Sequence, residues 1–241
     1  MISNKTFLAI IPARGGSKRL PRKNVLPLAG NPLINWSIEA GLNSQYINKV
    51  LVSSDDDEAL SIAQQAGADI IRRPAELAQD GSTSFDAIKH AIDNTEAHDY
   101  VVLLQPTSPL RTSQHIDEAI QLLEHKNADA VISVTTMEHS PLWANTLPSD
   151  DSMVGFLREE VLDLRSQELG SHYRLNGAIY IAKTDKLLAA GSFFLKDNVY
   201  AYKMPNEYSV DIDTELDFNW AEFLLNASRR RSFGGFAAGS R

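Results

Sequence analysis

A cationic stretch directly follows the first apolar run of the chain. Residues 13–24, the cationic loop, read ARGGSKRLPRKN and carry five Lys or Arg side chains in a protein whose net charge is −8. Gly15 and Gly16 have no Cβ, so backbone N–H groups can approach an anion closely here. We therefore predict a polyphosphate-binding loop. A solvated basic loop is the alternative, because the common phosphate fingerprints GxxxxGKS/T and GxGxxG are both absent.

Two aspartates near the other end of the chain have the spacing of a metal site. Asp211 and Asp213 are two residues apart in VDIDTELD, the acidic segment (210–217), and we predict a strand over residues 207–213. Alternate residues of a strand share one face, so both carboxylates would point the same way. Hard oxygen ligands of this kind suit Mg²⁺, which takes further ligands from water and substrate phosphates. Capping of the following helix is the alternative role for Asp213.

Apolar strand-like runs alternate with helical patterns along most of the chain. The predicted strands are residues 7–11, 49–54, 68–74, 100–106, 128–137, 176–183, 198–204 and 207–213, and the predicted helices are residues 31–44, 57–67, 84–94, 115–127, 184–190 and 214–226. Continuously apolar strands separated by helices indicate an α/β fold with a doubly wound, mostly parallel, Rossmann-like sheet. Such sheets bind ligands beyond the carboxyl ends of their strands, where the cationic loop lies. The acidic run Asp55–Asp57 starts a helix, so we predict a structural role for it.

The rhythm of strands and helices breaks after Pro141. We predict one domain over residues 1–227, with an excursion at about residues 140–175 that has small strands of its own, and a disordered tail over residues 228–241. The sequence has no cysteine, which excludes disulfides, thiolate metal sites and thiol nucleophiles. No apolar run is long enough for a signal peptide or a membrane span, so we expect a cytoplasmic protein. The net charge of −8 argues against binding to nucleic acid or to an anionic membrane.

Five motifs resemble, in order, those of a known family. They are IPARGGSKRLPRKN, RRPAELAQD, LLQPTSPLRT, RLNGAIYI and VDIDTELD, spread over residues 6–225. Together they resemble the CMP-sialic acid synthetases, the cytidylyltransferases that act on nonulosonic acids. The resemblance implies transfer of a cytidylyl group from CTP to the anomeric hydroxyl of a nine-carbon α-keto sugar acid, with release of pyrophosphate. It also implies Mg²⁺ as cofactor and a homodimer whose interface the excursion builds.

The resemblance assigns roles to the residues at matching positions. The nucleotide-binding residues would be Arg14, Ser17, Lys18, Lys23, Asn24, Arg73, Ser84 and Gln105. The sugar-binding residues would be Gln105, Arg165, Asn176, Tyr180, Phe193 and Phe194, with Arg174 as the alternative to Arg165. Arg14, Lys23 and Asp211 would be catalytic, and Asp211 and Asp213 would bind the metal. Arg14 and Lys23 also fit the charge argument, because fixed cations stabilise the charge that develops on phosphates in the transition state.

Several positions have simpler explanations. An ion pair with Glu76 is the alternative for Arg73, and packing in the core is the alternative for the Phe193–Phe194 pair.

Trp143 stands where sialic acid-specific members of the family commonly carry a lysine. Because an indole cannot pair with a carboxylate, we hypothesise a di-N-acylated acceptor, legionaminic or pseudaminic acid, in place of N-acetylneuraminic acid. The alternative functions are a CMP-Kdo synthetase, whose family shares the fold and the early IPAR loop, and a non-catalytic nucleotide-binding module.

Overall fold

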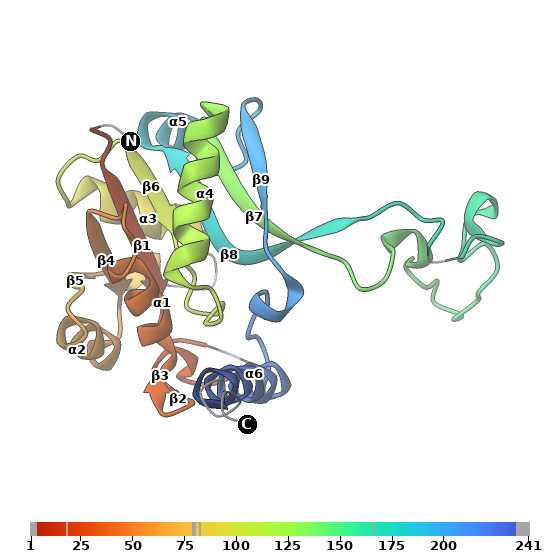
Figure 1. Ribbon diagram of the computed structural model, residues 1–241, viewed down its shortest axis with the longest axis horizontal. Coiled ribbons are helices and arrows are strands. Elements are labelled where there is room, and N and C mark those ends of the chain that lie inside the picture. Colours follow the sequence, from red (N-terminus) through yellow and green to blue (C-terminus); the bar gives the residue numbers. More distant parts are fainter. Residues whose placement is uncertain (1–3, 18, 79–80, 82, 166, 235–241) are drawn as a thin grey trace, which may run out of the picture.

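A seven-stranded sheet forms the centre of the protein (Figure 1). The computed structural model describes residues 4–17, 19–78, 81, 83–165 and 167–234. The strands lie in the order β5-β4-β1-β6-β8-β7-β9. Their bounds are Phe7–Ala13 for β1, Lys49–Ser54 for β4, Asp69–Arg72 for β5, Tyr100–Leu103 for β6, Ala130–Thr136 for β7, Tyr173–Lys183 for β8 and Val199–Lys203 for β9. A separate two-stranded sheet pairs β2 (Pro27–Leu28) with β3 (Asn31–Pro32).

The large sheet is mostly parallel, as the sequence predicts. β1 pairs in parallel with β4 and β6, β4 with β5, and β7 with β9. Among the described strands of this sheet, only β8 runs antiparallel to its neighbours, β6 and β7. Residues 7–11 of the interior strand β1 are at most 1% exposed. Burial on both faces explains why this strand is continuously apolar and does not alternate with polar residues.

Helices cover both faces of the sheet. They are α1 (Leu33–Leu42), α2 (Asp57–Gln65), α3 (Ser84–Asp93), α4 (Ser113–Lys126), α5 (Thr184–Ala190) and α6 (Glu215–Gly234). Short 3₁₀ helices are η1 (Lys23–Val25), η2 (Ala75–Leu77), η3 (Pro141–Trp143), η4 (Glu159–Val161) and η5 (Asn206–Tyr208). On one face Phe7, Ala9 and Ile11 share a buried cluster with α1 and α4. On the other face Leu8 and Ile10 share a cluster with α3 and α5, so neighbouring residues of β1 serve different layers of the core.

Polar caps fix where three of the helices begin. Asp56 precedes α2, and its carboxylate accepts the N–H groups of Glu58 and Ala59. Thr83 before α3 and Thr112 before α4 each form a capping box with the third residue of the helix. These caps also stabilise the loops that lead from the carboxyl ends of the strands into α2, α3 and α4.

The prediction of a strand over residues 207–213 is wrong. The 3₁₀ helix η5 occupies its start, and an extended loop follows. In that loop the Ile212 N–H donates to the Thr107 carbonyl at 2.8 Å, and the Ile212 side chain is fully buried. One apolar side chain docked into the core between exposed Asp211 and Asp213 produces the same alternation as a strand. Asp211 and Asp213 are therefore exposed on either side of the buried Ile212, although this segment pairs with no strand.

The last helix extends past its predicted end. Residues 228–234, which we predicted to belong to a disordered tail, are the final turns of α6, and residues 235–241 lie outside the described part of the chain. Arg229 lies 5.3 Å from the centre of the Trp36 ring and donates to the Ala29 carbonyl at 3.0 Å. These contacts with α1 and the β2–β3 turn hold the extended helix. Within the described ranges, no helix combines the length and apolarity needed to cross a membrane.

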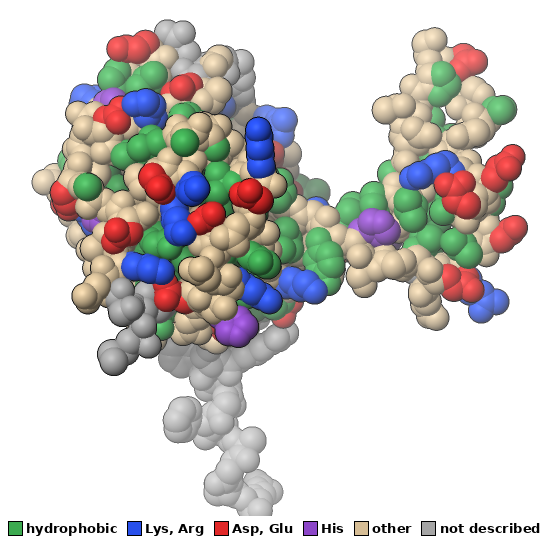
Figure 2. Space-filling view, turned by 90° about the horizontal axis from the view of Figure 1, so that it is seen from above, with side chains coloured by type: hydrophobic (Ala, Val, Ile, Leu, Met, Phe, Trp, Pro, Cys, Tyr) green, Lys and Arg blue, Asp and Glu red, His purple; other side chains and the backbone are tan. Residues whose placement is uncertain are grey.

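The excursion between β7 and β8 projects from the body as an arm, residues 137–172 (Figure 1). The paired ends of β7 and β8 lead into it, with Thr136 opposite Tyr173. Its described residues form the 3₁₀ helices η3 and η4, and none of them forms the small strands that we predicted. Figure 2 shows apolar side chains on the arm beside acidic ones. Val154 is 94% and Met153 61% exposed, so the arm presents apolar surface to solvent.

Candidate active site

The residues predicted to bind the nucleotide converge on one cleft. It has a volume of about 520 Å³ and lies at the carboxyl ends of β1 and β6, the edge at which open α/β sheets bind ligands. The predicted residues that line it are Arg14, Ser17, Lys23, Asn24, Arg73, Ser84, Gln105 and Asp213. Lys18 lies outside the described residues. The fold thus brings the cationic loop and the acidic segment together.

Polar contacts fix the backbone of the cationic loop. The Gly15 N–H donates to Asp55 Oδ1 at 3.0 Å, and the Asn24 side-chain amide donates to the Arg14 carbonyl at 3.0 Å. A Cβ on Gly15 would lie 3.2 Å from Asp56 Cβ, so the close approach of the backbone leaves little room for a side chain. The acidic run is structural, as predicted, because it caps α2 and holds this loop. We expected the Gly15 N–H to bind an anionic ligand. It donates to the Asp55 carboxylate of the protein itself, so this expectation is not met.

Two cations of the loop meet Asp213 at the cleft. Lys23 is buried, donates its Nζ to the Ile212 carbonyl and lies 3.5 Å from Asp213 Oδ1. Arg19 is exposed and donates to Asp213 Oδ2 at 2.9 Å. A buried lysine held by a backbone carbonyl has a defined position, which the flexible lysines of a solvated loop do not have. This observation favours a binding loop over the solvated alternative.

Asp211 carries a perturbed carboxyl group. Although Asp211 is an exposed residue, the protein atoms around its carboxyl group partly desolvate it and raise its pKa above the ordinary value; the Thr107 hydroxyl opposes the rise, Asp213 adds to it and Lys23 opposes it. Two carboxylates that repel each other favour a cation between them. No group of three or more Asp, Glu or His side chains within the described ranges forms a complete metal site. A carboxylate pair nevertheless fits Mg²⁺, because water and substrate phosphates supply the remaining ligands.

Capping of α6 falls to Thr214 and Asp217. Asp217 Oδ2 accepts the Thr214 hydroxyl and N–H, both at 2.8 Å, and the Asp213 N–H at 3.1 Å. Desolvation raises the pKa of Asp217, but the hydrogen bonds from Thr214 and Asp213 outweigh it, and the pKa is lowered. The Asp213 carboxylate therefore does not serve as the cap that we considered for it. It lines the cleft.

Arg73 forms part of the buried wall of the cleft. Its guanidinium donates to the Ser53 carbonyl at 2.7 Å and to the Ser53 hydroxyl at 3.2 Å. Burial lowers its pKa, Asp55 opposes this shift and Arg14 adds to it. Because Ser53 belongs to β4, the sheet itself holds the guanidinium. A donor fixed in this way suits the carbonyl edge of a nucleobase.

The apolar part of the cleft was not predicted from the sequence. Leu77, Ala78, Ala87 and Leu103 line it near Ser84. Isolated apolar residues carry no motif, and the periodic pattern assigns Ala87 and Leu103 to the core, where both are indeed buried. Only the folded arrangement reveals that these side chains also offer a surface against which a base can pack.

Gln105, Gly177 and Asp211 converge at one point. A Cβ on Gly177 would lie 3.6 Å from Gln105 Oε1 and 3.8 Å from Asp211 Oδ2. Gly177 has a φ of +72°, which residues with a side chain rarely adopt. It lies in an irregularity of β8, where the register with β7 shifts between Ile132 and Val134. Irregularities of this kind redirect strands near functional sites, and the bare backbone here leaves room between the amide and the carboxylate.

The aromatic residues predicted to bind the sugar lie together. Burial raises the pKa of Tyr180, and the negative charge of Asp211 raises it further. The Tyr180 ring contacts those of Phe193 and Phe194, with centroids 5.8 Å and 6.2 Å away. Phe193 is buried in the same cluster as Leu8, whereas Phe194 is 56% exposed. Phe193 thus belongs to the core, the alternative role, and Phe194 is accessible to a ligand.

Asn176 does not face the cleft. It is 1% exposed, and its Oδ1 accepts the Ser133 hydroxyl at 2.6 Å and the Ala178 N–H at 3.3 Å. Its Nδ2 donates to the Ser209 hydroxyl at 3.0 Å and to Met204 Sδ at 3.3 Å. Protein atoms therefore satisfy the buried amide. This position does not support the predicted contact with the sugar; the side chain instead ties β7 and β8 to the loop before the acidic segment.

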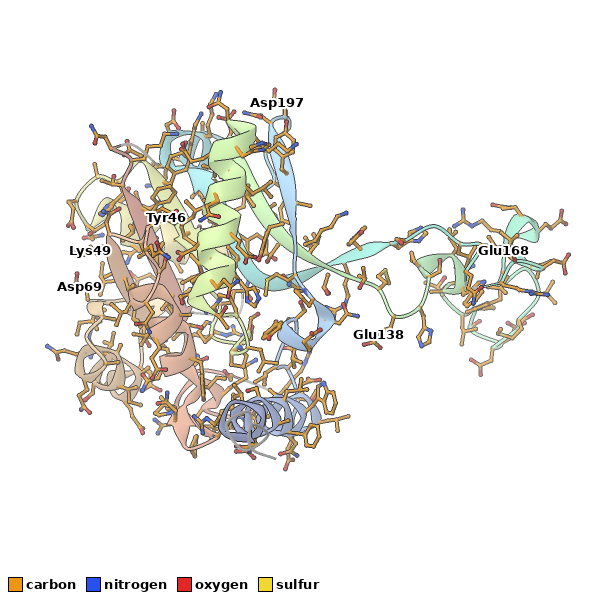
Figure 3. All side chains as sticks on the ribbon, in the orientation of Figure 1. Tyr46, Lys49, Asp69, Glu138, Glu168 and Asp197 are labelled. Carbon is orange, nitrogen blue, oxygen red and sulfur yellow. The ribbon has the colours of Figure 1, made fainter. Side chains whose placement is uncertain are left out.

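Arg165 lies on the arm, away from the cleft. Its backbone N–H donates to Glu168, which Figure 3 places in the outlying part of the arm. Arg174 belongs to β8 at the base of the arm, and its Nη1 donates to the Leu175 carbonyl at 3.4 Å. The structure therefore does not bring Arg165 together with the other predicted sugar-binding residues of the same chain.

Comparisons with known proteins agree on one family. The cytidylyltransferase family model matches residues 8–221. A protein of Escherichia coli O18:K1:H7 named N-acylneuraminate cytidylyltransferase is 39% identical over 227 residues, which are 93% of this chain and 53% of that protein. A Campylobacter jejuni protein named pseudaminic acid cytidylyltransferase is 32% identical over 231 residues, which are 94% of this chain and 99% of that protein.

Structural similarity extends to the whole fold. A solved CMP:2-keto-3-deoxy-manno-octonic acid synthetase complexed with CTP matches with a TM-score of 0.70 at 18% identity, covering 92% of this chain and 99% of that chain. The chain spans about half the length of the curated N-acylneuraminate relatives that it matches. The family model covers most of the chain, and a relative of nearly the same length is 32% identical. The chain therefore belongs to the cytidylyltransferase family.

Proposed function

We propose that the chain transfers a cytidylyl group from CTP to the anomeric hydroxyl of a nine-carbon α-keto sugar acid and releases pyrophosphate. The observation that carries this proposal is the cleft in which the cationic loop and the acidic segment meet, through Lys23 and Asp213, beside Gln105. Relatives named for N-acylneuraminate and for pseudaminic acid support this class of acceptor. We expect the reaction in the cytoplasm, where CTP is available.

The cations of the cleft suit the charge that this reaction develops. Attack of a hydroxyl on the α-phosphorus places negative charge on the non-bridging oxygens and on the leaving pyrophosphate. Lys23 has a fixed position, because the Ile212 carbonyl and Asp213 hold it. Arg14 lines the same cleft, and Asn24 holds its backbone. Fixed cations stabilise the transition state effectively, since they need no reorganisation when the charge develops.

We propose Asp211 and Asp213 as the residues that hold Mg²⁺. The bound ion would offset the charge of the triphosphate and orient the reacting groups for in-line displacement. Arg19 and Lys23 both contact Asp213, so the two cations are placed to meet phosphates bound at the same point. Because the pKa of Asp211 is raised, this carboxyl ionises at a higher pH than an ordinary aspartate, and its capacity to bind a cation declines correspondingly early on acidification.

We propose that Tyr180 and Phe194 bind the acceptor. The rings of Tyr180 and Phe194 contact each other, with centroids 6.2 Å apart, and suit the N-acyl groups of a nonulosonic acid. Trp143 lines an apolar hollow of about 540 Å³ in the arm together with Phe156. Neither side chain carries a positive charge that could pair with a carboxylate. We therefore propose a di-N-acylated acceptor, legionaminic or pseudaminic acid, in preference to N-acetylneuraminic acid. The pseudaminic acid relative of nearly equal length supports this choice.

We propose that two copies assemble through the arm. The arm projects from the body (Figure 1), and its exposed Leu147, Met153 and Val154 are apolar. Arg165 lies too far out to serve the cleft of its own chain, whereas an arm that reaches the cleft of a second copy would place this guanidinium near the acceptor carboxylate. Closed pairs of this kind are the commonest assemblies of identical chains.

Pyrophosphate release from CTP and Mg²⁺ tests the proposal. N-acetylneuraminic, legionaminic and pseudaminic acids and Kdo serve as separate acceptors. Release with a nonulosonic acid, and its loss in Lys23→Met, is the expected result. Release with Kdo alone would change the acceptor and keep the reaction. CTP binding without release from any acceptor would contradict the transfer and favour a non-catalytic nucleotide-binding module.

A further inference from the structure

Arg111 is a buried cation for which the proposed reaction has no direct use. It is 2% exposed, and burial lowers the pKa of its guanidinium to about 9. Its Nη1 is buried and makes no hydrogen bond to a described residue. Burying a charge without an opposite charge costs free energy, and apolar residues of similar volume often replace buried ions without loss of stability. Stability is therefore a weak explanation for an arginine at this position.

The guanidinium connects three segments behind the cleft. Nη2 donates to the Ser37 hydroxyl of α1 at 2.8 Å and to the Gln105 carbonyl at 2.9 Å, and Nε donates to the Ala178 carbonyl of β8 at 3.1 Å. The Ser37 hydroxyl donates to the same Gln105 carbonyl at 3.2 Å. Gln105 lines the cleft, and Ala178 follows Gly177, where a Cβ would lie 3.6 Å from Gln105 Oε1.

We propose that Arg111 is a positioning residue that sets the position of Gln105, which lines the cleft, relative to Gly177 of β8. The inference rests on the proposed transfer, because that reaction needs Gln105 held in place at the cleft. A planar guanidinium directs several donors along fixed directions, which the single ammonium of a lysine cannot reproduce. Its hydrogen bonds tie the Gln105 loop to β8 through one rigid group. Misplacement of reacting groups by about 1 Å costs on the order of 10²-fold in turnover.

Arg111→Met tests this role, because methionine fills apolar volume and removes every hydrogen bond of the guanidinium. We expect kcat for pyrophosphate release to fall about 10²-fold, with little change in KM for CTP, since the side chains proposed to contact the nucleotide remain. Arg111→Lys should recover only part of kcat. Asp117→Asn is the matched control: Asp117 is a buried charge of α4 that accepts the Ser44 hydroxyl and the Gln45 N–H. This control should lower Tm without lowering kcat.

Hydrogen exchange gives a readout that does not depend on turnover. In Arg111→Met, residues 104–108 and 176–180 should exchange at least about tenfold faster, the equivalent of losing one hydrogen bond to a charged group. Residues 43–47 should change only in Asp117→Asn. An unchanged kcat in folded Arg111→Met, or unchanged exchange in both segments, would overturn the proposal. Failure of the unmodified protein to release pyrophosphate with any acceptor would refute the proposed function. Hydrogen exchange would still decide whether Arg111 holds the Gln105 loop against β8.

Discussion

At the scale of single residues, Lys23 shows how burial turns a lysine into a fixed cation. Its ammonium is held by the Ile212 carbonyl and Asp213. We expect Lys23→Met to lower the rate of pyrophosphate release about 10²- to 10³-fold, the usual effect of removing one fixed group that stabilises transition-state charge. Arg22→Gln is the control on the same loop, because Arg22 pairs with Asp56 and Glu58. Equal losses in both variants would mean that the loop needs its charge only to fold.

We expect the ionised Asp211 carboxylate to lower the stability of the fold while it serves the reaction. Its folded-state pKa is raised, so the folded protein binds a proton more readily than the unfolded chain, and the ionised carboxylate costs stability at neutral pH. Asp211→Asn should therefore raise Tm at neutral pH while abolishing pyrophosphate release. The gain should shrink as the pH falls through the raised pKa, because the wild-type carboxyl then becomes neutral as well. Thermal unfolding followed over a pH series measures both effects.

Asp217 supplies the control of opposite sign. Its folded-state pKa is lowered despite desolvation, because Thr214 and the Asp213 N–H donate hydrogen bonds to it. The stability that it contributes is present above the ordinary aspartate pKa and is lost as the pH falls through the lowered one. Asp217→Asn should lower Tm at neutral pH by about 2–4 °C, the effect of losing a helix cap. A fall in Tm for Asp211→Asn at neutral pH would contradict the conclusion that the ionised Asp211 carboxylate costs stability.

At the scale of elements, the irregularity of β8 at Gly177 combines a backbone constraint with a functional one. Its φ of +72° makes Gly177→Ala cost about 1–2 kcal/mol of unfolding free energy, whatever the surroundings. Gly191 ends α5 with a φ of +66°, and a Cβ there would meet only Phe85 Cε1, at 3.9 Å. Both alanine variants should lose similar stability in urea, but only Gly177→Ala should lose turnover. Loss of turnover in both would point to general destabilisation.

The fold could be predicted wherever a local pattern decides the element. The continuously apolar β1 is an example, because burial on both faces leaves its mark on five successive residues, 7–11. Residues 207–213 misled us, since one docked side chain, Ile212, imitates the alternation of a strand. The extension of α6 depends on Arg229 and Trp36, which lie far apart in the sequence. No local pattern records such a contact.

The candidate site could be predicted where charge and glycine cluster along the chain. The cationic loop and the acidic segment meet at the cleft through Lys23 and Asp213. Asn176 was misplaced because its partners, Ser133 and Ser209, come from other elements and decide which way the amide points. The apolar wall of the cleft escaped prediction for a different reason, since core residues and ligand-facing residues of this kind have the same composition.

At the scale of the whole molecule, the arm projects from the body and exposes apolar side chains to solvent. Val154→Asp should weaken association of two copies and shift sedimentation velocity toward the monomer, because it places a charge at a side chain that is 94% exposed in one copy. Leu188→Asp, an exposed position on α5, is the control and should leave the assembly unchanged. Unchanged sedimentation in Val154→Asp would remove this part of the arm from the interface.

Mixing two inactive variants decides whose cleft the arm serves. Lys23→Met damages the cleft and leaves the arm intact, whereas Arg165→Ala damages the arm and leaves the cleft intact. If arms reach across, a mixed pair holds one complete site, made from the intact cleft of one copy and the intact arm of the other. Equal mixing should then restore about a quarter of the turnover, because about half of the pairs are mixed and one of their two sites is complete. If each arm serves its own cleft, no pair holds a complete site, and the mixture stays as inactive as its components.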